Sequence, residues 1–64
     1  MKERLVSAAL MHFKAVKSRA EANLEVYLNT PVGVGEHPDL VQEVIGLIKT
    51  IAEADEAIKY LEEK

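Results

Sequence analysis

The sequence predicts an all-α fold, an antiparallel two-helix hairpin that dimerises into a four-helix bundle. Proline and glycine gather between Pro31 and Pro38, apart from Gly46. The flanks on both sides are rich in Ala, Leu, Glu and Lys, which favour helices, and their apolar residues recur in steps of three and four. We expect a single domain over 1–64, with a first helix over about 2–29, a loop over 30–37 and a second helix over about 38–63.

The expected helix ends follow from local chemistry. Thr30 precedes a proline and is therefore pushed out of the helical region, which ends the first helix after Asn29. Pro38 suits the first position of the second helix, where a missing N–H costs nothing. Asp39 then places negative charge near the positive end of the helix dipole.

Each predicted helix carries one apolar stripe of the coiled-coil type. The stripe of the second helix consists of Leu40, Val44, Leu47, Ile51, Ala54, Ile58 and Leu61. The looser stripe of the first helix consists of Val6, Ala9, Phe13, Val16, Ala20, Leu24 and Tyr27. Pairing residues whose numbers add to 67 sets a small residue against a large one three times, for example Phe13 against Ala54. We therefore expect the two stripes to form the core in that register.

Charge favours the same antiparallel arrangement. The first twenty residues carry a net charge of +4 and the remainder a net charge of −7. The hairpin is expected to bring Lys14 near Glu53, and Lys2 and Arg4 near Glu62 and Glu63. Each exposed pair contributes only ~0–1 kcal/mol, so charge supports the register without creating it.

The second helix carries another apolar stripe beside the one that packs against the first helix, and this stripe is left without a partner. A chain this short buries only about 60% of its unfolded-state surface and, without cysteine, gains nothing from disulfides, so oligomerisation is the expected source of stability. The predicted self-association interface consists of Leu10, Leu28, Val41, Ile45, Ile48 and Ala52. Lys17 and Asp55 fall on the same side, where an ion pair could fix the register of the dimer. A weaker stripe on the back of the first helix either extends the assembly or is a solvated, alanine-rich face; it consists of Ala8, Met11, Ala15, Ala22 and Val26.

The sequence shows no arrangement typical of an enzyme, a cofactor site or a metal site. Gly33 and Gly35 precede a helix start, as in some anion sites, but the Lys-Ser/Thr ending of a phosphate-binding loop is missing, so their expected role is structural. Glu36, His37 and Asp39 are adjacent, yet metal sites need ligands that converge, so we expect no metal there. No catalytic residue, cofactor or metal is therefore predicted.

Partners and location follow from the same composition. No segment approaches the ~20 consecutive apolar residues of a membrane span, and the N-terminus does not read as a signal peptide, so we expect a cytoplasmic protein. The expected partner is a second copy of the chain, or another protein. The main alternative is a nucleic-acid-associated accessory protein, because the first helix begins with a basic segment. The net charge of −3 and the lack of an aromatic platform disfavour it.

The run from Leu24 to Asp39, LEVYLNTPVGVGEHPD, resembles a segment of short uncharacterised proteins of T4-like phages, including those that infect marine cyanobacteria. Those proteins have a loop of the form Asn-x-Pro-x-Gly-x-Gly-Glu-His between helical segments, and Thr30 lies at a variable position. The resemblance implies a viral origin and a location in the host cytoplasm. It implies no activity, cofactor or catalytic residue.

Overall fold

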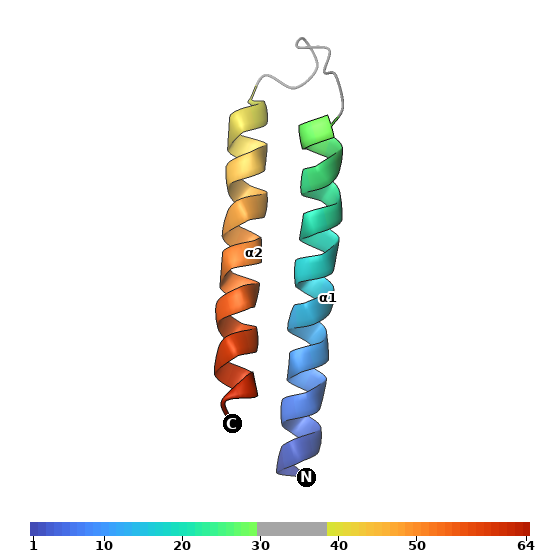
Figure 1. Cartoon of the computed structure of the whole chain (residues 1–64), viewed down its shortest axis with the longest axis vertical. Coiled ribbons are helices and arrows are strands. Elements are labelled where there is room, and N and C mark those ends of the chain that lie inside the picture. The colour runs from blue at the N-terminus through green and yellow to red at the C-terminus, as the bar shows by residue number, and fades with distance from the viewer. Residues whose placement is uncertain (30–38) are drawn as a thin grey trace.

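The computed structural model describes residues 1–29 and 39–64, and it confirms the all-α prediction for them. They form two helices, α1 (Lys2–Asn29) and α2 (Leu40–Glu62), with no strand in these ranges. The helices lie side by side and antiparallel, with both chain termini at one end (Figure 1). The molecule is only one layer thick, with extents of 51 × 14 × 13 Å. A single pair of helices has room for one seam of contact and leaves the rest of each helix at the surface.

The start of α2 differs slightly from the expected one. Asp39 has non-helical backbone angles and is the N-cap, so the first helical residue is Leu40, two residues later than predicted. The Asp39 side chain accepts a hydrogen bond of 2.9 Å from the backbone N–H of Gln42. This satisfies one of the N–H groups that the first turn of a helix leaves without an intrahelical partner. The predicted role of Pro38 lies outside the described residues.

The two predicted stripes do form the contact between α1 and α2. All fourteen of their residues are buried or half-buried. Only two of them are fully buried, Ala20 at 4% exposure on α1 and Ala54 at 1% on α2. Small side chains at these positions let the two helices approach closely. Among the described residues the buried core is therefore two alanines, with larger side chains only partly covered around them.

The polar contacts between the two helices do not follow the predicted sum of 67. Three polar contacts cross between the helices: Tyr27 to Glu43 at 3.3 Å, Lys17 to Asp55 at 2.6 Å and Lys14 to Glu62 at 3.9 Å. Their residue numbers add to 70, 72 and 76, each larger than 67. Side chains lean toward the N-terminus of their own helix, so facing side chains come from positions farther along both helices. Displacing one helix along the other by a whole turn keeps the same faces in contact, so the stripes alone do not fix which polar side chains meet.

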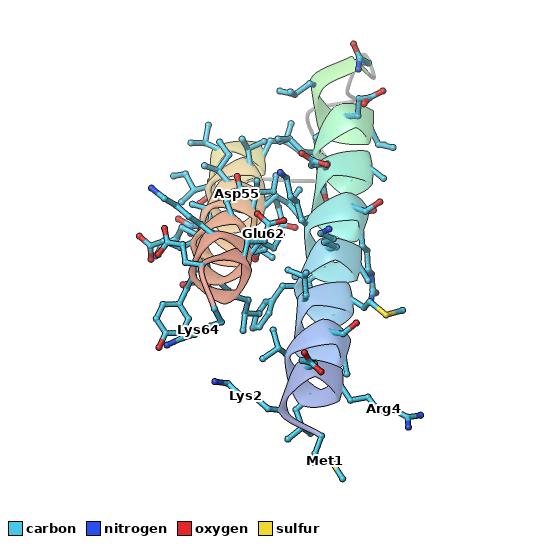
Figure 2. The ribbon with its side chains drawn as sticks, turned by 60° about the horizontal axis from the view of Figure 1, so that its bottom comes forward. Met1, Lys2, Arg4, Asp55, Glu62 and Lys64 are labelled. Carbon is cyan, nitrogen blue, oxygen red and sulfur yellow. The ribbon has the colours of Figure 1, made fainter. Side chains whose placement is uncertain are left out.

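Two of the predicted charge pairings are consequently wrong. Lys14 pairs with Glu62 instead of lying near Glu53, which is exposed and shares a face of α2 with Tyr60. Arg4 points away from α2, so it does not meet the carboxylates at the end of that helix (Figure 2). Lys2 lies at the same end of the hairpin as Lys64 (Figure 2). Net charge thus favours the antiparallel arrangement without selecting particular partners.

Candidate self-association surface

A group of large apolar side chains lies at the surface beside the contact between α1 and α2. We call the apolar face the set Leu28, Val41, Ile45, Ile48 and Ala52. The exposed fractions of its four large side chains range from 42% for Ile45 to 70% for Val41. Ala52 is exposed as well. A single exposed leucine is ordinary in a protein surface, whereas a contiguous apolar group marks a surface of interaction.

Helical geometry explains why α1 leaves this face uncovered. Four of its residues, from Val41 to Ala52, follow one another at spacings of four, three and four, so they form a stripe along α2. Each residue in an α-helix is rotated by about 100° from the one before it, which places Val41 well to the side of Leu40 in the seam. One neighbouring helix cannot cover both stripes. The sequence pattern alone therefore predicted the exposure of the second one.

The face continues across the hairpin onto α1. Leu28 of α1 and Ile48 of α2 line one shallow groove between the helices, together with Leu24 and Ile51. Glu21 and Glu25 line the same groove from α1 and give it a polar margin.

Leu10 is the predicted interface residue that does not join the others. It is half-buried and lines a separate hollow at the terminal end, with Met1, Val6 and Ser7. In an antiparallel hairpin the first turns of α1 lie far from the first turns of α2, because these are at opposite ends (Figure 1). The predicted interface thus divides into four residues toward the Asn29–Leu40 end, Ala52 at the middle of α2, and Leu10 near the termini.

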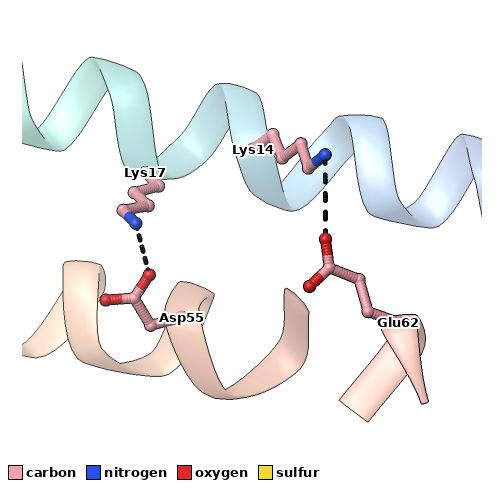
Figure 3. Close-up of polar contacts among 4 residues, drawn as sticks. All are labelled: Lys14, Lys17, Asp55 and Glu62. Carbon is pink, nitrogen blue, oxygen red and sulfur yellow. Dashed lines mark ion pairs between the residues drawn. The ribbon is translucent and has the colours of Figure 1, made fainter. Parts of the chain in front are cut away.

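An ion pair lies at the end of the apolar face that is nearer the chain termini. Lys17 Nζ lies 2.6 Å from Asp55 Oδ1, across the contact between α1 and α2 (Figure 3). The hydrogen bond to Asp55 and the charge of that carboxylate raise the pKa of Lys17 above its ordinary value of 10.5. Lys14 and Glu62 form a second, longer pair at 3.9 Å between exposed side chains (Figure 3). The predicted pairing of Lys17 with Asp55 is present within one hairpin, where it joins α1 to α2.

Several exposed apolar residues lie away from this face. Met11 and Val26, both expected on the back of α1, are exposed there. Leu5 and Tyr60 are also exposed, and sequence reasoning did not single them out because neither belongs to a long stripe. The Lys64 ammonium lies 4.5 Å from the centroid of the Tyr60 ring, which is a cation–π contact. These residues are spread over different sides of the hairpin and form no second group comparable to the apolar face.

The described residues contain no group of side chains arranged to bind a metal ion. In 1–29 and 39–64 no three His, Cys, Asp or Glu side chains come together in a way that could hold a metal ion. The predictions for Gly33, Gly35, Glu36 and His37 lie outside these residues. Neither α1 nor α2 combines the length and the apolarity that crossing a bilayer requires. Among the described residues, the apolar face is therefore the main candidate for a functional surface.

Comparison with known proteins adds no family to this description. No protein-family model, no curated protein and no solved structure matches the chain. Its function must be argued from its own residues.

Proposed function

We propose that this chain is a small helical interaction or scaffold protein that self-associates through the apolar face. One observation carries the proposal. Among the described residues the hairpin fully buries only Ala20 and Ala54, while four larger side chains on one face remain 42–70% exposed. The proposed role requires no catalytic group, cofactor or metal ion.

The free energy involved is large for a chain of this size. Together, the exposed fractions of Leu28, Val41, Ile45 and Ile48 correspond to about two fully exposed apolar side chains, each worth roughly 1.5–3 kcal/mol on burial. Covering them would therefore contribute roughly 3–6 kcal/mol per chain. A core in a chain below ~70 residues rarely supplies more than about 3–5 kcal/mol. Association through this face would be comparable to everything the isolated hairpin can gain.

A second copy of the chain is the simplest partner that fits. A two-fold dimer places the same patch on both subunits, so one apolar face covers the other. Two hairpins stacked in this way make a four-helix bundle, with helices roughly 20° from antiparallel.

The proposal is tested by measuring mass and stability as a function of concentration. Sedimentation equilibrium in the micromolar range is expected to give twice the chain mass. Because the dimer binds only folded chains, the melting temperature should rise with protein concentration. A folded monomer whose melting temperature is independent of concentration would contradict the proposal, and the face would then await a different partner.

The alternative, a nucleic-acid-associated accessory protein, has less support. Lys14 and Lys17 of the basic segment are engaged with carboxylates of α2, and Arg19 is exposed. Phosphate contacts would reveal themselves through a steep loss of affinity for DNA or RNA as salt increases. Binding with that salt dependence would favour the alternative. The phage accessory role and the host-cytoplasm location implied by the resemblance stay predictions.

A further inference from the structure

We infer that the two copies meet through their α2 helices, which run antiparallel with the two-fold axis passing between Ile45 and Ile48. The inference rests on the proposed self-association and adds the arrangement of the partner. It places Ile45 of one copy opposite the partner's Ile48 and Val41 opposite the partner's Ala52.

The spacing of the stripe is symmetric about that axis. Ile45 and Ile48 lie at equal distances on either side of it, and so do Val41 and Ala52. Antiparallel pairing of two identical stripes therefore brings all four residues of each copy into register. The outer pair sets a large side chain against a small one, which allows the helices to approach closely. A parallel pairing would instead set Val41 against Val41 and leave Ala52 facing only Ala52.

The composition of α1 argues against pairing α2 with the partner's α1. On the side of α1 that faces the same way, Leu10 and Leu28 are separated by the charged residues Lys14, Lys17 and Glu21. Glu21 lines the groove beside Leu28, and Lys17 is held by Asp55. Setting the partner's stripe on α1 would place Val and Ile side chains against these charges and partly desolvate them, which is unfavourable. Only the two α2 stripes present apolar residues to apolar residues along their full length.

Charge at the end of the stripe fits the antiparallel arrangement. Asp55 and Glu56 follow Ala52 by three and four residues and flank the stripe, and both are exposed. In the proposed dimer they lie within about one turn of the partner's Leu40, the first residue of its α2. The N-terminus of a helix carries partial positive charge, which attracts these carboxylates although the partner's Asp39 caps the same end. In a parallel pair the same carboxylates would instead lie beside those of the partner.

Cysteine cross-linking tests the arrangement directly, because the chain has no cysteine of its own. Val41→Cys and Ala52→Cys are prepared as separate full-length variants, and sedimentation establishes that each keeps the mass of the wild type. They are oxidised alone and as an equal mixture. A disulfide forms only where the two Cα atoms come within about 7 Å. Positions 41 and 52 are about 16 Å apart along the helix, so the pairings give different results.

The antiparallel arrangement predicts a cross-linked dimer in the mixture, up to about half of the chains after subunit exchange, and none in either variant alone. Glu53→Cys mixed with Val41→Cys is the matched control, because Glu53 lies at nearly the same level on another face of α2. That mixture should remain uncross-linked. Cross-linking within each single variant would show a parallel pair and overturn the inference. A dimer that cross-links in no combination would overturn it as well, whereas a monomeric wild type would refute the proposed function itself.

Discussion

Replacing Ile48 with aspartate puts a carboxylate at the centre of the apolar face. Ile48 is 50% exposed in the single chain, so the hairpin alone would lose about 1 kcal/mol, half the burial value of an isoleucine. In the dimer each copy would lose the other half as well, and each carboxylate would be partly desolvated at a cost of about 1–3 kcal/mol. Two copies together weaken association by roughly 4 kcal/mol or more, about a thousand-fold in Kd. Ile48→Asp should therefore be a monomer that is largely unfolded.

The assay is sedimentation at micromolar concentration combined with circular dichroism melting at several concentrations. Gly46→Asp is the matched control, since it adds the same charge two residues away on α2. A Cβ atom at Gly46 would meet no other atom within 4 Å, so this side chain has open space. The control should keep the mass, the helicity and the concentration-dependent melting of the wild type. If Ile48→Asp does the same, the apolar face does not mediate self-association and the argument from its exposure is wrong.

Three further changes test the interior and edge of the hairpin. Gly46→Ala should raise stability by about 0.5–1 kcal/mol, because alanine favours the helix and its Cβ has room, and urea unfolding at fixed chain concentration measures it. Asp55→Asn should bring the pKa of Lys17 back toward its ordinary value, which NMR titration of the lysine detects. Since the folded pKa is raised, the stabilisation holds below pH 10.5 and disappears as pH rises through the folded pKa, so wild type and variant should converge there. Ala20→Leu should cost about 1–3 kcal/mol, because it forces a larger side chain into a fully packed position.

Each of these changes has a result that would count against it. An unchanged or lower stability of Gly46→Ala would mean that the position is crowded in the assembled protein. An unaltered Lys17 titration in Asp55→Asn would mean that the ion pair is not populated in solution. Ala22→Leu is the control for Ala20→Leu, since Ala22 is exposed on the same helix. Equal stabilities for these two leucine variants would show that Ala20 is not at the helix contact.

The sequence by itself determined the two helices and the faces they present. The residues of the two contact stripes follow one another at steps of three and four, so their burial is a local consequence of the helical period. The exposure of Val41, Ile45 and Ile48 was predicted in the same way, because one partner helix covers only one stripe.

Tertiary structure alone decided how far one helix slides along the other. The seam pattern nearly repeats with every turn, so a shift of about 3.6 residues exchanges the neighbours of Phe13 or Leu47 and leaves the same faces in contact. In the structure Lys14 pairs with Glu62, and Glu53 is exposed on another face of α2. The antiparallel packing of the whole helices also separates Leu10, which lines a hollow at the terminal end, from the apolar face. Local sequence specifies which way a side chain points from its own helix, but its neighbours on the other helix depend on contacts between residues far apart in the chain.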